Sequence, residues 1–450
     1  MSATSTRQPP VPAPVAEADA RPADGPPLPP VVPGLRRLLA HPRFMHHHRL
    51  VAAVLAGNVG LAWQGGTAGW WQGPDAASAL GAAALANVAL AVLVRQQYVI
   101  NFFFWLATRA PVRWPLRIRA TLGKVYHFGG LHVGAALAGT GWFLAQLVAM
   151  TVQRGPGGTA ALSTGFAVAV ALLAMVATAL PPVRAAHHDL FELVHRFGGW
   201  AALLLLWVQS ALLAGHPAAL AGMPQAWVLA LLTASVALPW LRLRRVAVEV
   251  VRPSSHVALV RFNHGVTPFP GSSTPVSRNP LRQWHSFANV PAPEHDGFRL
   301  AISRAGDWTG QFIDETPDRV WVKGIPTAGV ANIETLFRRV VYVATGSGIG
   351  PVLPHLLAGQ VPARLVWAAR RHRETFGEEL VAEILDRQSD AVLWDTARDG
   401  KPDMLTLAYQ AYVEFDAEAV ICISNRRLTW QVVHSLERRG IPAYGAIWDS

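Results

Sequence analysis

Six apolar stretches, each about 20 residues long, lie between residues 50 and 242 and constrain the fold more than any other feature. A helix of that length crosses the hydrocarbon of a bilayer and satisfies its backbone hydrogen bonds internally, as lipid requires. We place the stretches near residues 50–71, 77–94, 125–152, 160–181, 190–214 and 225–241. The aromatic segment Tyr98–Leu106 either extends the second stretch or forms a helix at the membrane interface. The pattern predicts an all-α, six-helix transmembrane bundle.

The charged residues support an integral membrane protein and predict its orientation. Hydrophobic residues make up 51% of the chain and charged residues 15%, which is too few charges for a soluble protein of 450 residues. Lysine and arginine gather before the first span, between the second and third, and after the sixth, whereas the loops at the opposite ends hold only Arg154. By the positive-inside rule both termini face the cytoplasm, and we expect the protein in the plasma membrane. These segment ends account for the net charge of +11, so no nucleic-acid partner is expected.

Histidines near the cytoplasmic ends of two predicted spans point to a metal site. His127 and His132 lie on the third span, and His188 and His195 lead into the fifth. Ionisable residues inside a membrane are costly and are usually functional. Two facing imidazoles can hold a heme iron axially. Glycines around His132 and His195 leave space for a flat macrocycle, so this pair is the leading candidate, and His188 and His127 are further candidates.

The outer halves of the third and fifth spans contain no histidine. The sequence therefore predicts one heme, on the inner side, and no evident electron route to the outside. A different metal chemistry uses the same residues. His127 and His132, the pair His187-His188 and the run His46–His48 resemble the di-iron clusters of membrane desaturases and hydroxylases, although the usual second and third histidine boxes are missing.

The sequence after the sixth predicted span indicates two further domains. Alternating segments at 244–251, 256–262, 297–302 and 320–323, separated by Pro, Gly and Ser, predict a small antiparallel β-barrel. Strands at 339–343, 363–369, 391–394 and 419–423, alternating with helices near 376–387 and 403–412, predict an α/β domain with a parallel sheet. The expected organisation is a disordered, Pro/Ala-rich N-terminus (1–44), the bundle (45–243), the barrel (244–332) and the α/β domain (333–450).

A glycine loop follows the first strand of the predicted parallel sheet. Residues 344–351 read Ala-Thr-Gly-Ser-Gly-Ile-Gly-Pro. A strand that turns into a helix while its N–H groups face a pyrophosphate has no room for Cβ atoms, and Gly346, Gly348 and Gly350 supply the clearance. Pro351 suits the first turn of the following helix. The spacing differs from the common dinucleotide fingerprint, so the loop needs the support of the rest of the chain.

These features together resemble the ferric reductase and NADPH oxidase superfamily, whose soluble part resembles ferredoxin–NADP reductase. The likeness covers roughly residues 45–450 and is carried by Phe191-Glu-Leu-Val-His195, Gln283-Trp-His-Ser-Phe287, Gly306-Asp-Trp-Thr309 and Thr345–Pro351. The chain also resembles the membrane oxidoreductase region of fungal adenylate-forming, peptide-synthetase-like proteins. That second likeness is carried by Gly129-Gly-Leu-His132, Thr309, Lys323-Gly-Ile-Pro326 and Gly445–Ser450.

The resemblance implies roles for residues of this chain. The resemblance implies that Arg282, Trp284, His285, Ser286 and Phe287 hold the flavin and that Trp308 and Thr309 lie beside its phosphates. An equally good interpretation of Trp308 is an aromatic residue of the barrel core. The NADPH loop would be Thr345, Gly346, Ser347, Gly348, Gly350 and Pro351. Arg370 and Arg371, after the second parallel strand, would take a 2′-phosphate and favour NADPH over NADH, unless they form a solvated charge cluster. Cys422 would lie near the nicotinamide, or be a buried strand residue, and Trp448 would cover the flavin.

The expected function follows from these roles. The chain is predicted to pass electrons from cytosolic NADPH through FAD and one inner-leaflet b-type heme to an unidentified acceptor. Its partners would be the lipid bilayer, the nicotinamide dinucleotide and that acceptor. Two alternatives stay open: a histidine-cluster membrane oxygenase with a fused reductase domain, and a non-catalytic membrane redox sensor.

Overall fold

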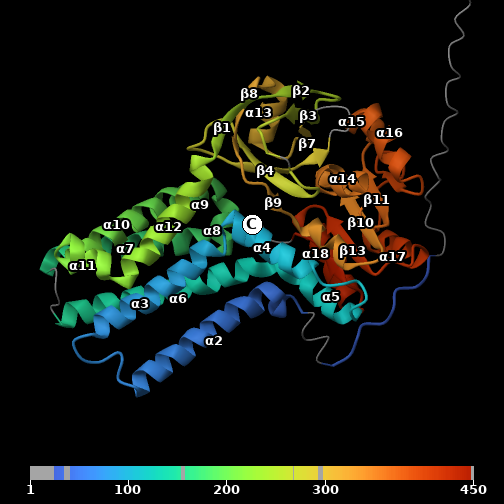
Figure 1. The fold of residues 1–450 in the computed structure, drawn as a ribbon. Coiled ribbons are helices and arrows are strands. Elements are labelled where there is room, and N and C mark those ends of the chain that lie inside the picture. Colours follow the sequence, from blue (N-terminus) through green and yellow to red (C-terminus); the bar gives the residue numbers. More distant parts are fainter. Residues whose placement is uncertain (1–24, 35–40, 154–157, 267, 292–296, 447–450) are drawn as a thin grey trace, which may run out of the picture.

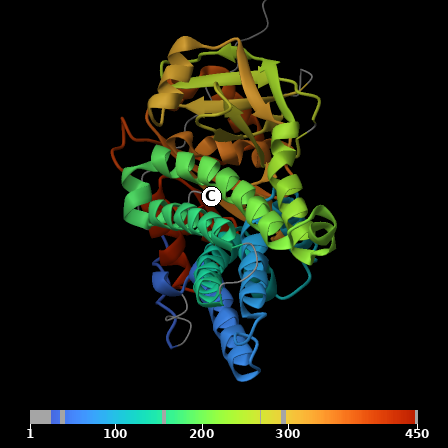
Figure 2. The ribbon, with the colours of Figure 1, turned by 90° about the vertical axis from the view of Figure 1, so that its left-hand side faces the viewer.

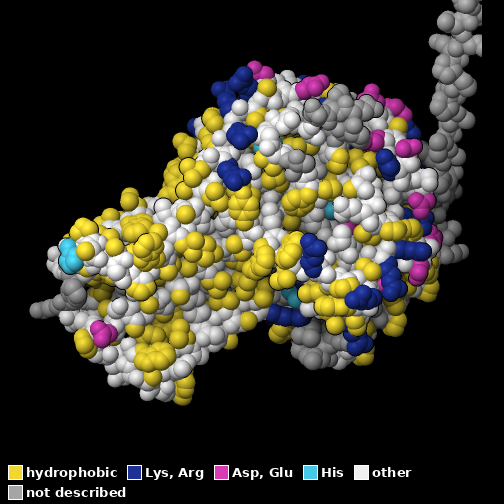
Figure 3. All heavy atoms as spheres, in the orientation of Figure 1, with side chains coloured by type: hydrophobic (Ala, Val, Ile, Leu, Met, Phe, Trp, Pro, Cys, Tyr) yellow, Lys and Arg dark blue, Asp and Glu magenta, His cyan; other side chains and the backbone are white. Residues whose placement is uncertain are grey.

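The computed structural model describes residues 25–34, 41–153, 158–266, 268–291 and 297–446. A helical bundle and a β-rich part lie end to end (Figure 1). Viewed from the bundle end, the barrel stands beyond the helices (Figure 2). Hydrophobic side chains cover the surface of the bundle, whereas charged side chains gather on the β-rich part (Figure 3). On the bundle, Val152, Val170 and Trp227 are 78%, 67% and 69% exposed, as expected of side chains that face lipid rather than water.

The bundle consists of α2 (His46–Thr67), α3 (Ala76–Leu93), α6 (Gly129–Gln153), α7 (Gly158–Ala179), α10 (Gly199–Ala214) and α12 (Pro224–Leu241), with the short α11 (Pro217–Gly222) before the last. Within the described residues, five segments are long and apolar enough to cross a membrane: Ala76–Leu93, Leu116–Gln153, Gly158–Ala179, His188–Ala214 and Pro224–Leu241. These match five of the six predicted spans. The remaining predicted span, near residues 50–71, is the first along the chain; it forms α2, which is not among the five.

Helix α2 differs from these five segments because it carries a polar residue, Asn58, in its middle. Asn58 and Asn87 exchange two amide hydrogen bonds, at 3.0 and 2.8 Å, which join α2 to α3. The Trp142 indole of α6 donates to the Asn58 Oδ1 at 2.8 Å. Asn58 lowers the hydropathy of α2, yet its amide is satisfied inside the bundle, as polar groups in a membrane must be. Hydropathy alone therefore understates how α2 belongs to the bundle.

Short helices connect the second and third long helices and touch the β-rich part. They are α4 (Gln97–Thr108), α5 (Leu116–Leu122) and the 3-10 turn η2 (Gly123–Phe128). Helix α4 is separate from α3, so Tyr98–Leu106 does not extend the second span. The Asn101 amide donates to the Pro326 carbonyl and accepts from the Ala328 N–H, both at 2.9 Å, so α4 packs against the barrel. Before α10 lie α8 (Pro181–Ala186), α9 (His188–Leu193) and a π-helical turn, η3 (Val194–Gly198).

The barrel is built from two antiparallel sheets. The first has the order β1 (Leu243–Ala247), β8 (Arg319–Lys323), β4 (Ser272–Ser277) and β5 (His285–Ala288), with β9 (Thr327–Ala328) beside β4; the second has the order β2 (Glu249–Val251), β3 (Val257–Phe262), β7 (Phe298–Ser303) and β6 (Val290–Pro291). Helix α13 (Asp307–Glu315) packs its Phe312 and Ile313 against the barrel core. The predicted single strand 244–251 is two strands in different sheets, because the chain changes sheet at Val248. Strands β4, β5 and β6 and helix α13 were not predicted.

The α/β domain contains a five-stranded sheet in which all neighbouring strands run parallel. Its order is β12 (Val392–Asp395), β11 (Ala363–Ala369), β10 (Val340–Thr345), β13 (Ala419–Ile423) and β14 (Ala443–Tyr444). Helices α14 (Ile349–Ala358) and α16 (Glu378–Arg387) cover one face, with α15 (His372–Phe376) before α16, and α17 (Met404–Glu414) and α18 (Arg426–Glu437) cover the other (Figure 1). Both faces are buried, which explains the continuous apolar runs. The strand order reverses between β10 and β13, and such a switch point is where open α/β sheets bind ligands. The predicted strand 363–369 is confirmed residue for residue.

Candidate functional site

The glycine loop lies at the switch point of the parallel sheet. Strand β10 ends at Thr345, a single turn, η5 (Gly346–Gly348), follows, and α14 begins at Ile349. Gly346 has a φ of +49°, which favours glycine. A Cβ on Gly348 would lie 2.0 Å from the Ile423 carbonyl oxygen of β13, so only glycine fits. The Trp367 indole of β11 donates to the Gly346 carbonyl at 3.1 Å and holds the loop from the other side.

The loop is thus a strand–turn–helix unit whose backbone lies against two neighbouring strands. The Thr345 and Ser424 hydroxyls hydrogen-bond across the ends of β10 and β13. Backbone N–H groups at the start of α14 and the helix dipole favour an anion there. Pro351 lies in the first turn of α14, as predicted.

Cys422 is fully buried in the core formed by β10, β13, α17 and α18. Burial raises the pKa of its thiol to about 12, partly offset by a hydrogen bond with Thr429. A thiol that stays protonated inside a packed core is typical of a structural cysteine. This placement favours the buried-strand interpretation of Cys422 over direct contact with a nicotinamide.

The predicted 2′-phosphate residues lie at the carboxyl end of β11. Arg370 and Arg371 are both exposed. The Arg371 guanidinium donates to Glu374 at 3.1 Å, and its backbone N–H donates to Asp395 at 3.0 Å. That backbone bond helps hold the pKa of Asp395 below its usual range, against the opposing effect of burial. Arg371 is thus engaged in an exposed ion pair with Glu374, and Arg370 is the neighbouring exposed cation.

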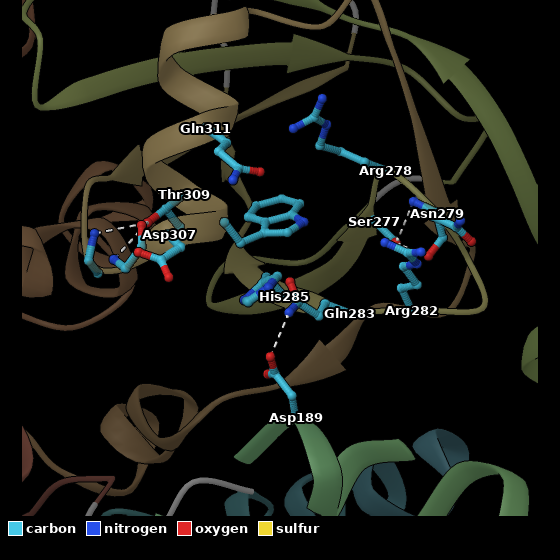
Figure 4. Close-up of a pocket in the computed structure, with 13 residues that line it drawn as sticks. Asp189, Ser277, Arg278, Asn279, Arg282, Gln283, His285, Asp307, Thr309 and Gln311 are labelled. Carbon is cyan, nitrogen blue, oxygen red and sulfur yellow. Dashed lines mark hydrogen bonds between the residues drawn. The ribbon is translucent and has the colours of Figure 1, made fainter. Parts of the chain in front are cut away.

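A cavity of about 700 Å³ opens between the β4–β5 connection and the start of α13. Figure 4 shows side chains from both sides turned toward this space. The lining residues are Asp189, Ser277, Arg278, Asn279, Arg282, Gln283, His285, Ala305, Gly306, Asp307, Trp308, Thr309 and Gln311. Of the predicted flavin residues, the cavity thus brings together Arg282, His285, Trp308 and Thr309.

An aromatic stack forms the back of this cavity. The His285 and Trp308 rings lie 4.3 Å apart and nearly parallel, and Phe312 lies 5.3 Å beyond Trp308. Phe287 also faces Trp308, at 6.1 Å. Burial lowers the pKa of His285, so its ring is a neutral stacking surface at physiological pH. Trp308 therefore lines the cavity and packs on the barrel core, which combines the two predicted roles.

Three of the predicted flavin residues, Trp284, Ser286 and Phe287, are not among the residues that line the cavity. Side chains alternate along a strand, so His285 and Phe287 face Trp308 while Ser286 points away. The Trp284 ring instead packs edge-on against Trp240 of α12, at 6.3 Å, and beneath the Lys323 ammonium, at 4.4 Å. Trp284 is therefore a contact between barrel and bundle.

The start of α13 shapes the other wall. The Thr309 hydroxyl accepts hydrogen bonds from the Ala305 and Gly306 N–H groups, at 2.9 and 3.1 Å (Figure 4). This arrangement fixes the loop before the helix, whose N-terminal end favours phosphate oxygens. Ser277, Arg278, Asn279 and Gln311 were missed as lining residues. The turn signal Arg-Asn-Pro at 278–280 could have located the β4–β5 connection.

Two residues of the bundle reach the edge of this cavity. Gln283 donates to the Asp189 carboxylate of α9 at 3.1 Å (Figure 4). Arg196 of the π-helical turn donates to the backbone carbonyls of Leu281, at 2.9 Å, and Arg282. Lys323 lies beside this contact, and burial, followed by the charge of Arg196, lowers its pKa to about 8. The cavity is thus bound directly to the segment that carries His195.

His132 and His195 are held in the way that metal-ligating histidines usually are. The His132 Nδ1 is 2.8 Å from the Ala91 carbonyl, and the His195 Nδ1 is 3.1 Å from the Phe191 carbonyl. A carbonyl only accepts, so each Nδ1 carries the proton and each Nε2 keeps its lone pair for a metal. His195 also lies in a π-helical turn, a feature common at functional sites.

The glycines beside His132 do not leave space for a macrocycle. A Cβ on Gly130 would lie 2.3 Å from the His47 carbonyl, and one on Gly134 would lie 2.9 Å from the Val54 Cβ. Both glycines therefore admit the close approach of α2. On the other helix, the nearest neighbour of Gly198 is Met175, at 3.5 Å from an added Cβ.

The other two candidate ligands lie apart from this pair. The His127 ring stacks on His46 of α2, with centroids 5.9 Å apart, and the His188 side chain is 53% exposed beside Asp189. Within the residues that the structure describes, no group of three or more His, Cys, Asp or Glu side chains could hold a metal ion. The di-iron alternative gains no support from these residues. Trp448 lies outside the described residues.

Comparison with known proteins identifies relatives. Residues 330–450 match the family described as adenylate-forming reductase 03009, C-terminal domain. The chain is 44% identical over 387 residues to adenylate-forming reductase 03009 of Coprinopsis cinerea. The aligned region covers 83% of this chain and 38% of the relative. It is 42% identical over 382 residues to adenylate-forming reductase 06235 of the same fungus, covering 82% and 37%. The chain thus spans about two fifths of the length of these relatives. The predicted likeness to adenylate-forming proteins is confirmed.

Solved structures show more distant similarity. A ferredoxin NADP+ reductase from Neisseria gonorrhoeae with bound FAD and NADP is 13% identical, covers 45% of this chain and 98% of its own, and has a TM-score of 0.36. A flavohemoglobin from Malassezia yamatoensis with bound FAD and heme is 17% identical, covers 80% and 97%, and has a TM-score of 0.39.

Proposed function

Because the chain is homologous over most of its length to part of the fungal adenylate-forming reductases, we propose that it is a membrane-bound oxidoreductase. Electrons pass from cytosolic NADPH through FAD and an inner-leaflet b-type heme to an acceptor in the membrane or cytosol. The protein lies in the plasma membrane with both termini in the cytoplasm.

One observation carries the proposal: the flavin-sized cavity is joined to the π-helical turn that carries His195. Arg196, the next residue along that turn, donates to the carbonyls of Leu281 and Arg282 at the edge of the cavity. A flavin bound there lies beside the helix that presents the candidate heme ligand. The chain itself thus supplies a short connection between a soluble redox site and the membrane.

The residues present fit the two nucleotides. The start of α13 and Arg282 suit the FAD phosphates, and the His285–Trp308 stack suits a flat ring. The glycine loop suits the pyrophosphate of NADPH, with Arg370 beside it for the 2′-phosphate. FAD, when bound, supplies the chemistry that links a two-electron hydride donor to one-electron acceptors.

The residues present also fit a heme in part. His132 and His195 each offer an Nε2 whose ring is oriented by a backbone carbonyl. A heme held by these histidines would not lie over Gly130 and Gly134, because α2 packs against both glycines.

An absorption spectrum of the purified full chain, before and after NADPH, tests the membrane half. We expect flavin bands and a Soret band that shifts on reduction. His132→Ala and His195→Ala remove the Soret band, whereas His188→Ala, at a half-exposed position, keeps it. Flavin bands without heme would overturn the membrane half, and iron without a Soret band would favour the oxygenase. Absence of NADPH-dependent flavin reduction would favour the redox sensor.

A matched glycine pair tests the nucleotide half. A Cβ at Gly348 overlaps the Ile423 carbonyl at 2.0 Å, whereas a Cβ at Gly350 meets the Ala301 carbonyl at an ordinary 3.5 Å. We expect Gly348→Ala to raise the KM for NADPH at least tenfold and Gly350→Ala to change it by less than about threefold. NADPH-dependent ferricyanide reduction measures both. Equal effects would show that the close contact of Gly348 with Ile423 does not set the shape of the nucleotide loop, and would contradict its proposed role in NADPH binding.

A further inference from the structure

A second cavity, of about 390 Å³, lies where the bundle meets the α/β domain on the side away from β5 and α13. The start of α2, helix α5 and the turn η2 form one side, and α18 and the chain before β14 form the other. Figure 1 shows α5 next to α18 at this place. This volume lies in the range of small-molecule sites, and nothing in the proposed electron path uses it.

The walls are mainly apolar and aromatic. They include Met45, Tyr126, Trp430, Val433, Ile441 and Tyr444. Aromatic walls favour a flat ring, which stacks or packs edge-on against them. Ligand sites combine such walls with a few polar groups that fix orientation.

His127 supplies a polar group of that kind. The residue lines the cavity and is 5% exposed, and its buried Nδ1 has no hydrogen-bond partner in the structure. An unmade buried hydrogen bond is costly, so a ligand toward which this ring turns gains affinity by completing it. The His46 ring lies parallel to His127, at 5.9 Å, and also lines the cavity.

The charges around the cavity favour a neutral ligand. The Lys124 ammonium is already paired with the Glu437 carboxylate and donates to the Ala443 carbonyl at 2.6 Å. The cation in the wall is therefore compensated from within the protein. Arg117 lines the cavity from an exposed position, and the His434 ring stacks on Trp430 at 5.0 Å. A carbonyl oxygen on a ring meets the His127 imidazole without bringing an unpaired charge.

The cavity also lies close to the proposed end of the electron path. His127 in η2 precedes His132 of α6 by five residues, and the two elements follow each other without a break in the segment Leu116–Gln153. The His47 carbonyl touches Gly130, so α2 links the wall residue His46 to the same level of α6. A redox-active ring in this cavity is thus a near neighbour of His132.

We propose that this cavity binds a quinone, which is the electron acceptor. The reduction of the quinone rests on the proposed function, which supplies the electrons, whereas the binding of the quinone does not depend on it. NADPH gives up a hydride, which carries two electrons, and the ring gains two electrons and two protons. The net reaction consumes one proton from solvent and converts NADPH and quinone to NADP+ and quinol.

Binding of 2-methyl-1,4-naphthoquinone to the oxidised full chain in detergent, followed by calorimetry, tests the site. We expect one site per chain. His127→Leu removes the hydrogen bond and raises Kd about tenfold. Ala120→Phe fills the cavity from α5 and raises Kd at least as much. Ile118→Phe is the matched control, since Ile118 lies on the same helix, is 46% exposed and does not line the cavity; its Kd stays within twofold.

The outcomes separate the inference from the proposed function. Unchanged affinity in both cavity variants, or no binding to the parent chain, would overturn the quinone site. NADPH-dependent reduction of ferricyanide, which needs only the soluble sites, reports on the function. A chain that reduces ferricyanide but binds the naphthoquinone equally well in all variants keeps the function and loses the inference. A chain that binds the naphthoquinone as expected but reduces neither acceptor keeps the site and loses the function.

Discussion

The bundle meets the soluble part at two junctions that are built differently. At the first, α5 and η2 contact the α/β domain through buried ion pairs. The Arg119 guanidinium donates two hydrogen bonds to the Glu418 carboxylate, at 2.7 and 3.0 Å, and the Arg119 side chain is 3% exposed. Lys124 and Glu437 form a second pair nearby.

At the second junction, η3 and α12 contact the barrel through backbone carbonyls, a side-chain amide and aromatic rings. Arg196 binds backbone carbonyls, Gln283 binds Asp189, and Lys323 lies over the Trp240 and Trp284 rings at 4.9 and 4.4 Å. The first junction thus depends on paired charges, whereas the second depends on single hydrogen bonds and cation–π contacts. Loss of one partner leaves a charge without its main partner at the first junction but not at the contacts of Arg196 with backbone carbonyls at the second.

Breaking the first junction is expected to have the largest effect. Arg119→Ala removes the two side-chain hydrogen bonds to the partly exposed Glu418 carboxylate and is predicted to lower the free energy of unfolding by about 2–3 kcal/mol. Arg338→Ala, which removes a 66% exposed partner 3.8 Å from the same carboxylate, should cost less than about 1 kcal/mol. Thermal unfolding in detergent measures both. Similar losses would show that burial does not distinguish the two partners.

The same pair predicts an acid limit. The hydrogen bond from Arg119 holds the pKa of Glu418 below its ordinary value of 4.5. A carboxyl with a lowered folded pKa contributes stability above its unfolded pKa and loses it as the pH falls through the folded pKa. The parent chain should therefore lose stability below about pH 4.5 more steeply than Glu418→Gln, in unfolding midpoints measured from pH 7 down. If stability falls equally steeply with pH in the parent chain and in Glu418→Gln, Glu418 does not contribute to the acid limit.

Weakening the second junction should change electron transfer more than stability. Arg196→Gln loses the hold on Leu281 and Arg282 and is predicted to slow reduction of the membrane cofactor by NADPH about tenfold, with a smaller loss in Arg196→Lys. Ferricyanide reduction by the soluble sites should stay within twofold. Stopped-flow spectra follow both reactions. A parallel fall in both rates would indicate a general structural role for Arg196.

The smallest effect is expected at Lys323. Burial lowers its pKa to about 8, so the folded state loses this proton before the unfolded state does. Stability should therefore rise between about pH 8 and the unfolded value near 10.5. Lys323→Met should remove this rise and change the free energy of unfolding at pH 7 by no more than about 1 kcal/mol, since lost cation–π contacts oppose the relief of burial. An unchanged pH profile would assign the rise to another group.

Local patterns predicted much of the fold. The apolar runs of β10, β11 and β13 are buried on both faces, so composition alone identifies them, and the glycine loop follows from the steric demand of one turn. Strand β4 was missed because Ser272–Ser277 contains Pro275 and three serines, and only its pairing with β5 and β8 makes it a strand. Pairing between distant segments leaves no local signal.

The candidate site was predicted less completely for the same reason. His285 and Trp308 were identified and line the cavity, but which face of β5 meets α13 depends on the register with β4, so the sequence could not show that Ser286 lies outside the cavity lining. Gly130 and Gly134 were interpreted as space for a cofactor, whereas they admit α2. A small residue signals a close neighbour without saying which one.

The first junction also has a consequence for how the chain is made. Arg119 and Glu418 are 299 positions apart, and the Tyr444 hydroxyl that donates to the Ala120 carbonyl is 324 positions away. The loop between the second and third membrane helices therefore emerges from the ribosome long before its partners exist. Closing so long a loop costs little more entropy than closing a shorter one, but it must wait until residues 418–444 have been synthesised. The contacts that fix this connection of the bundle are thus among the latest to form during synthesis of the described residues.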